Sequence, residues 1–312
     1  MMKWAQAWGT ANAQFYTRER AEDHFTTAPN VSTATAQILA GYAEQLASEL
    51  ETIHLVELGG GNAVLMNQLC QLLDARQIRY QATIVELRPR PANLPENIEW
   101  IQGSAPDALP DEVVGLIFAH EFLDDVGMGI AQRINLKSLR HVLVDPLTGN
   151  ESLGVEISNE EQAWIDQWWP TNQERIEIGL SRDAAWAGIV SHLKAGMAIA
   201  IDYAQGTSPV ASMMGFRQGV QLRPMPDGSM NLTAHVVIES CAAAVTANQS
   251  LITTQQELID RFFDHEGSRS SAAEQLQGLA RKSQWEQARD PSSFGAFAWL
   301  IQCVGLSETM SL

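Results

Sequence analysis

The feature that most constrains the fold is an apolar run that ends in three glycines and leads into a helical pattern. Residues 53–58, Ile-His-Leu-Val-Glu-Leu, have the composition of a buried strand. Gly59, Gly60 and Gly61 follow directly, and residues 64–75 have the periodicity of an amphipathic helix. Glycines allow a sharp turn and a close approach of a ligand to the backbone. The sequence therefore predicts a strand–turn–helix unit with a ligand near the free N–H groups at the start of the helix.

Other segments repeat the alternation of strands and helices. We expect further strands at residues 81–86, 98–101, 113–119, within 136–145 and at 197–203, and helices at 160–169, 236–245, 255–263 and 272–282. Residues 294–304 fit either a helix or a strand. This alternation predicts an α/β fold with a Rossmann-like core, in which helices cover a mostly parallel sheet.

The domain organisation is expected to be one large core with additions. Residues 1–50 are mostly helical in pattern and should pack on a core formed by residues 51–312. Residues 131–190 are harder to assign and are treated as an insertion. A second insertion, residues 205–232, is rich in Gly, Pro, Met and Arg and is expected to cover the substrate.

Charge and composition narrow the class of partner. The formal net charge of −17 disfavours a nucleic-acid ligand and suits a cationic cofactor or a basic protein substrate. The three cysteines and seven histidines show no metal-ligand spacing. No apolar run reaches the roughly 18 residues of a membrane span. We therefore expect a cytoplasmic protein with reduced thiols and no metal.

The glycine turn favours one cofactor over two others. A dinucleotide fingerprint requires a third glycine where Val64 stands, and the Gly-Lys-Ser/Thr ending of a phosphate-binding loop is absent. An S-adenosylmethionine site tolerates the missing third glycine, because it binds no pyrophosphate. In such a site Glu57 would hold the amino group of the cofactor, and Glu86, at the end of the second strand, would accept hydrogen bonds from the ribose. Ser104 and Ala105, in the loop after the third strand, would face the adenine.

Five separated blocks resemble the MidA-like S-adenosylmethionine-dependent methyltransferases, a family that includes the mitochondrial complex I assembly methyltransferase. The blocks are residues 25–32, 56–61, 120–124, 200–203 and 231–236. The resemblance implies a methyltransferase core with an added helical region and a substrate-covering insertion. It also suggests that Thr27 folds over the cofactor, although this residue could instead only cap a helix. His120 is expected beside the cofactor as well. The mitochondrial branch is associated with methylation of arginine on a respiratory-complex subunit.

The chain departs from the family pattern mainly at substrate positions. The replacements are Gly60 for proline, Ala63 for glycine, His120 for asparagine, Asp125 for alanine and Asn231 for aspartate. The loop at residues 215–219 keeps Arg217 but lacks the family's histidine. The cofactor positions are therefore better preserved than the substrate positions.

Carboxylates after the fourth strand are the candidate catalytic groups. Glu121 and Asp124 should lie at the carboxyl edge of the sheet, where ligands bind in such folds. Paired carboxylates suit a guanidinium substrate, and His235 or His120 could accept a proton. Asp124 could instead cap a helix, and His235 could make a structural hydrogen bond.

The leading hypothesis is a protein methyltransferase, with arginine as one acceptor. The alternatives are a small-molecule methyltransferase and a cofactor-binding assembly factor that has lost catalysis; a nicotinamide-dependent oxidoreductase is disfavoured by Val64. Tryptophans on the expected helix at residues 160–169 mark a candidate homodimer surface.

Overall fold

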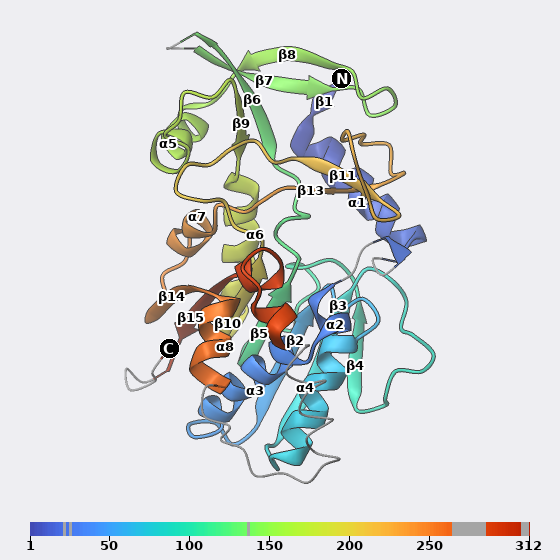
Figure 1. Cartoon of the computed structure of the whole chain (residues 1–312), viewed down its shortest axis with the longest axis vertical. Helices are drawn as coiled ribbons and strands as arrows, with labels where there is room; N and C mark the ends of the chain where they lie inside the picture. Colours follow the sequence, from blue (N-terminus) through green and yellow to red (C-terminus); the bar gives the residue numbers. More distant parts are fainter. Residues whose placement is uncertain (21–22, 25–26, 136–137, 264–284, 307–311) are drawn as a thin grey trace.

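The molecule consists of two stacked parts, one above the other in Figure 1. The computed structural model describes residues 1–20, 23–24, 27–135, 138–263, 285–306 and 312. The lower part contains a seven-stranded sheet with helices on both faces, and the upper part contains two smaller sheets.

The seven-stranded sheet forms the core of the lower part. Its strands, in spatial order, are β14 (Gln249–Thr254), β15 (Ala298–Val304), β10 (Leu193–Asp202), β5 (Val113–His120), β2 (Ile53–Leu58), β3 (Tyr80–Glu86) and β4 (Ile98–Gln102). Strands β10, β5, β2, β3 and β4 pair in parallel, whereas β15 pairs antiparallel with both β10 and β14. The predicted α/β fold with a Rossmann-like core is confirmed, and so are the five predicted strands in the parallel region.

Residues 294–304, for which the sequence allowed a helix or a strand, contain a strand. The helix considered for residues 294–304 is wrong: a single 3-10 turn, η2 (Phe294–Ala296), leads into β15. Strand β15 lies between β10 and β14, and Leu300 and Ile301 are completely buried on its opposite faces. A segment that is apolar on both faces lacks the periodicity that would distinguish a buried strand from a buried helix.

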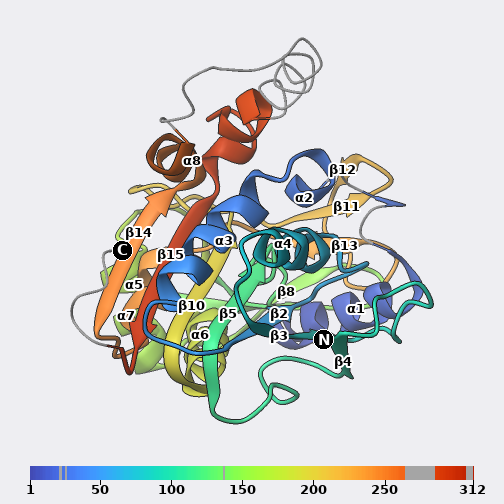
Figure 2. The same cartoon turned by 90° about the horizontal axis from the view of Figure 1, so that it is seen from below.

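Helices cover both faces of this sheet, as the view in Figure 2 shows. One face packs against α3 (Ala34–Leu46), α4 (Val64–Ala75) and α8 (Gln255–Phe263). The other face packs against α6 (Leu180–Ser191) and α7 (Ile238–Ala243). The helix expected at residues 272–282 lies outside the described residues.

The upper part consists of two smaller sheets and the N-terminal helix. One sheet contains β1 (Met2–Lys3), β6 (Gly129–Asn135), β7 (Ser138–Val144), β8 (Glu151–Glu156) and β9 (Arg175–Ile178), with α5 (Asn159–Trp168) packed beside β9. The other contains β11 (Met214–Arg217), β12 (Val220–Leu222) and β13 (Asn231–Thr233). The N-terminal helix α1 (Trp4–Arg18) packs on β13, and the short helix α2 (Ala28–Val31) contacts α3 and α4. The upper part thus lies over the carboxyl ends of the parallel strands (Figure 1).

None of the helices in the described part of the chain has the length and apolarity that a membrane crossing requires.

Candidate functional site

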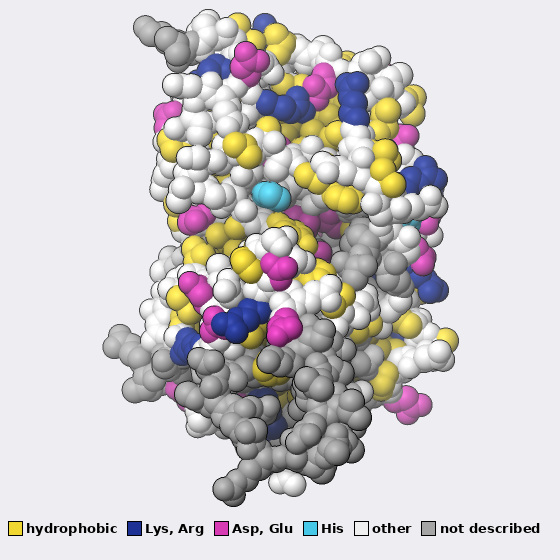
Figure 3. All heavy atoms as spheres, viewed as in Figure 1, with side chains coloured by type: hydrophobic (Ala, Val, Ile, Leu, Met, Phe, Trp, Pro, Cys, Tyr) yellow, Lys and Arg dark blue, Asp and Glu magenta, His cyan; other side chains and the backbone are white. Residues whose placement is uncertain are grey.

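A cavity of about 550 Å³ lies where the carboxyl ends of β2, β3 and β5 meet helix α1. Figure 3 shows acidic side chains in a recess near the middle of this face of the molecule, between the two parts. The sequence-predicted residues that line the cavity are Thr27, Glu57, Gly59, Gly60, Gly61, Glu86, Ser104, Ala105, His120 and Glu121. The fold therefore brings the ends of three strands and the segment before α2 to one place.

The glycine turn forms one wall of the cavity with bare backbone. Gly59 and Gly61 have φ angles of +64° and +55°, which side chains other than glycine rarely adopt. A Cβ atom at Gly60 would lie 2.6 Å from Ile84 Cγ2 and 3.1 Å from Glu57 Oε2. The turn is therefore intolerant of side chains, and its backbone is accessible to a ligand.

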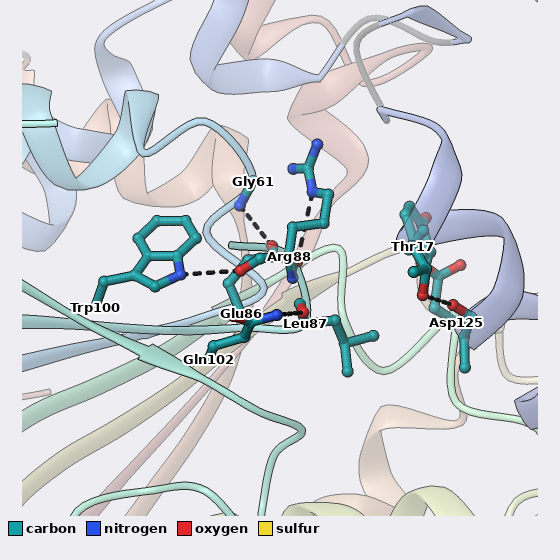
Figure 4. A network of polar contacts seen from close by, with 10 residues as sticks. Thr17, Gly61, Glu86, Leu87, Arg88, Trp100, Gln102 and Asp125 are labelled. Carbon is teal, nitrogen blue, oxygen red and sulfur yellow. Dashed lines mark hydrogen bonds and ion pairs between the residues drawn. The ribbon is translucent and has the colours of Figure 1, made fainter. Parts of the chain in front are cut away.

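Glu86 ties the glycine turn to the segment that follows β3 (Figure 4). Its carboxylate accepts hydrogen bonds from the backbone N–H of Gly61 at 2.9 Å and of Arg88 at 3.1 Å. The Arg88 guanidinium also lies 3.6 Å from it. The side chain of Gln102 on β4 donates to the carbonyl of Leu87 and fixes the same segment. The predicted ribose-binding carboxylate is thus held rigidly at the cavity wall.

Glu57 is a buried carboxyl group with an unfilled hydrogen-bonding position. Burial raises the pKa of Glu57 to about 8, although a hydrogen bond from the Met66 amide opposes this shift. Its Oε2 atom is buried without a hydrogen-bond partner. An amino group in the cavity would satisfy this oxygen and favour the charged carboxylate. Together with the bare glycine turn, this observation shows that the residues present fit S-adenosylmethionine.

The opposite end of the cavity is lined by helix α1. Asp125 accepts hydrogen bonds from the Tyr16 hydroxyl at 2.5 Å and from Asn231 Nδ2 at 2.7 Å. Asn231 Nδ2 also donates to the Tyr16 hydroxyl, at 2.7 Å. Asn12, one helical turn before Tyr16, donates to the backbone carbonyls of Asp125 and Leu232. Sequence reasoning missed Tyr16 and Asn12 because their partners lie more than 100 residues away along the chain.

Glu121 follows β5 directly and lies between the two ends of the cavity. Its φ angle is +51°, and its backbone N–H donates to the carbonyl of Ile201 on β10. Its Oε1 is buried without a hydrogen-bond partner. Burial, followed by the charges of Asp124 and Asp125, raises its pKa well above the ordinary range of a glutamate.

His120 is the neighbouring strand-end residue in the cavity wall. Burial lowers the pKa of His120 to about 4, so its ring is neutral at pH 7. Its Nδ1 lies 3.4 Å from Glu121 Oε1, and its Nε2 is buried without a partner.

The structure does not bring all the expected catalytic residues into the cavity. The Asp124 carboxylate accepts a hydrogen bond from Thr233 Oγ1 at 2.7 Å and lies behind the lining. The side chain of His235 also lies outside the lining, where its ring stacks on Tyr203 with 6.3 Å between the centroids. Glu121 is therefore the one expected catalytic residue, of Glu121, Asp124 and His235, that lines the cavity.

A buried arginine fixes the loop that carries these groups. Arg182 on α6 donates hydrogen bonds to the carbonyls of Asp124 and Val126, after β5, and to those of Ala234 and His235, after β13. It is 1% exposed. Arg182, a side chain from a distant helix, thus holds together the loops at the end of the cavity that helix α1 lines.

Asp202 fixes the same loop from the end of β10. Its carboxylate accepts hydrogen bonds from the backbone N–H groups of Leu123 and Asp124. Burial, followed by the charge of Asp124, raises the pKa of Asp202 well above its usual range.

Comparisons with known proteins agree with this geometry. A protein from Burkholderia thailandensis, crystallised with S-adenosyl-homocysteine, has a TM-score of 0.77 and 18% identity over 99% of this chain and 89% of its own. A native structure from the same organism gives a TM-score of 0.78 and 17% identity over 98% and 88%. These likenesses show a shared fold. No curated protein matches the chain.

The family model settles the class of the chain. Residues 34–256, most of the chain, match the model described as putative S-adenosyl-L-methionine-dependent methyltransferase. The predicted enzyme class and the predicted cofactor, S-adenosylmethionine, are thereby confirmed. The chain belongs to this family of S-adenosylmethionine-dependent methyltransferases.

Proposed function

We propose that this methyltransferase transfers the methyl group to a side-chain nitrogen of a protein, with the guanidinium of arginine as the acceptor. The observation that carries the proposal is the position of Glu121. This carboxyl group lines the same cavity as the glycine turn, and one of its oxygens is buried without a hydrogen bond. A nitrogen bound there would donate to Glu121 and lie next to the methyl-donor end of the site.

At the cofactor end, each residue has a distinct proposed task. The backbone at residues 59–61 admits the cofactor, Glu57 holds its amino group and Glu86 its ribose. Ser104, Ala105, Thr27 and His120 complete the walls of this end. When bound, S-adenosylmethionine supplies a methyl group on a sulfonium that is already an activated leaving group.

At the acceptor end, the protein must orient a nitrogen and remove its proton. Glu121 suits both tasks because burial makes it a stronger base than an exposed glutamate. Asp124 supports this end through Thr233 without facing the cavity. His235 lies outside the cavity lining, so we assign it no direct part in the reaction.

A protein acceptor is supported by charge. The formal net charge of −17 attracts basic polypeptide segments and would speed their encounter with the site. The same charge offers no advantage to a neutral small molecule.

The test pairs cofactor binding with methyl transfer. Wild-type protein, Glu121→Gln and the exposed control Asp107→Asn are titrated with S-adenosylmethionine by calorimetry and then supplied with methyl-labelled cofactor and a bacterial lysate. We expect all three to bind the cofactor within about threefold, and Glu121→Gln to lose transfer by at least about 100-fold. Label on protein arginine supports the proposal.

Other outcomes would overturn the proposal. Label on small molecules alone would favour the small-molecule methyltransferase. Cofactor binding without any transfer by the wild-type protein would favour the assembly factor. Full transfer by Glu121→Gln would remove Glu121 from the reaction.

A further inference from the structure

We infer that Asp125, together with Glu121, binds the methyl acceptor and requires it to carry a positive charge. This inference rests on the proposed function and assigns a residue and a ligand charge to the acceptor end. Asp125 lines the cavity beside Tyr16, opposite the glycine turn.

The hydrogen-bond donors around Asp125 match a carboxylate. The amide of Asn231 has two N–H groups, of which one donates to Asp125 Oδ1 and the other to the Tyr16 hydroxyl. Because that hydroxyl oxygen accepts from Asn231, its own proton points to Asp125 Oδ2. Both oxygens of Asp125 therefore accept hydrogen bonds and neither needs a proton. Tyr16 and Asn231 act as neutral donors that favour the anion.

The carboxylate has no cation in contact among the described residues. Arg88 is the one lysine or arginine in the described cavity lining, and it lies at the other end, against Glu86. Arg182 attracts Asp125 through space, but its hydrogen bonds run to backbone carbonyls. Burial accordingly raises the pKa of Asp125, because a desolvated anion without a partner is costly.

A second acidic group in the cavity points to a ligand. Glu121 lines the same cavity as Asp125, and its Oε1 is buried without a hydrogen bond. Two acidic side chains in one cavity suit a planar cation with several N–H donors.

Asn231 offers a way to move the charge without removing it. Its Nδ2 lies 2.7 Å from Asp125 Oδ1. Exchanging the two side chains would therefore keep one carboxylate at this contact.

The experiment measures cation binding to the protein saturated with S-adenosyl-homocysteine. The probe is butylguanidine, its neutral control is butylurea, and binding is followed by calorimetry for the wild type, Asp125→Asn, and the exchange variant Asp125→Asn/Asn231→Asp. We expect wild type to prefer butylguanidine at least about tenfold, Asp125→Asn to lose that preference, and the exchange variant to recover most of it. Recovery by the exchange variant would show that the loss in Asp125→Asn comes from the missing charge and not from misfolding.

Three results would overturn the inference. They are equal binding of butylurea and butylguanidine by the wild type, an unchanged preference in Asp125→Asn, and no recovery in an exchange variant that still binds S-adenosyl-homocysteine normally. These results are independent of the proposed function, because labelled transfer dependent on Glu121 would persist if Asp125 alone were misassigned.

Discussion

The two ends of the cavity are built in different ways. The cofactor end is assembled from consecutive strand ends and the loops beside them, and its central contact joins Gly61 to Glu86, 25 residues apart. The acceptor end joins α1, the loop after β5 and strand β13. Its contacts cross 109 residues between Tyr16 and Asp125, and 220 between Asn12 and Leu232.

Because of this difference, the two ends should tolerate different substitutions. The cofactor end depends on the local shape of the backbone, so one added methyl group can close it. The acceptor end depends on distant elements held in register by buried polar groups, so loss of one such group should release several segments together. Three experiments test this contrast.

The largest effect is expected from removal of the arginine that holds the acceptor end. Arg182→Met removes the side-chain donor to four backbone carbonyls and the charge that offsets three nearby acidic residues. The free energy of unfolding, measured with urea, should fall by about 3–5 kcal/mol. The control Arg175→Met removes a more exposed ion pair with Glu151 and should cost no more than about 1 kcal/mol. Equal losses in both variants would mean that the acceptor end does not depend on this contact.

The next effect should be confined to the cofactor end. Gly60→Ala places a methyl group against Ile84 and Glu57, and we expect the affinity for S-adenosyl-homocysteine to fall by about 100-fold, or about 3 kcal/mol. Gly206→Ala is the matched control, because a Cβ atom at Gly206 meets nothing within 4 Å. Calorimetric titration measures both. Normal binding by Gly60→Ala would show that the bare backbone is not what admits the cofactor.

The smallest effect concerns the pH dependence of cofactor binding. Below about pH 8 Glu57 is protonated in the free protein, whereas the amino group of the cofactor favours its carboxylate. Binding should therefore release a proton, and affinity should rise with pH by up to about tenfold per unit and level off above about pH 8.

The measurement is calorimetry in buffers with different ionisation enthalpies. Glu57→Gln should bind more weakly and lose the slope, whereas Glu99→Gln, an exposed change on β4, should keep it. A slope that persists in Glu57→Gln would assign the proton to another group.

The same raised pKa affects stability with the opposite sign. Because the pKa of Glu57 in the folded protein lies above its ordinary value of 4.5, folding favours the protonated form. Its contribution to stability is complete below about pH 4.5 and is lost as pH rises through about 8.

Much of the cofactor end could be predicted from the sequence. The glycine turn, Glu57 and Glu86 sit at fixed places in strand–turn–helix units, where local periodicity decides both structure and position. All the residues expected at the cofactor line one cavity in the structure. In the seven-stranded sheet, the sequence did not predict β14, and it left β15 open between a helix and a strand.

The acceptor end could be predicted only in part. Glu121 was expected there because it follows a buried strand directly. Asp124 and Asp125 are adjacent in the sequence, and nothing in their spacing tells which of them faces the cavity. The directions of the two side chains are set by the left-handed backbone at Glu121 and by the hydrogen bonds that the backbone N–H groups of Leu123 and Asp124 donate to Asp202.

The positions of the central strands along the chain, the glycine turn, and the acidic residues at the ends of β2 and β3 follow from the sequence, because these depend on neighbours within about one strand–helix unit. The contacts of Tyr16 and Asn231 with Asp125, and the closure of the loops around them by Arg182, follow only from the tertiary structure. These contacts form between segments that no local pattern relates, and they exist because packing α1 and the inserted sheets over the strand ends buries polar groups that must find partners.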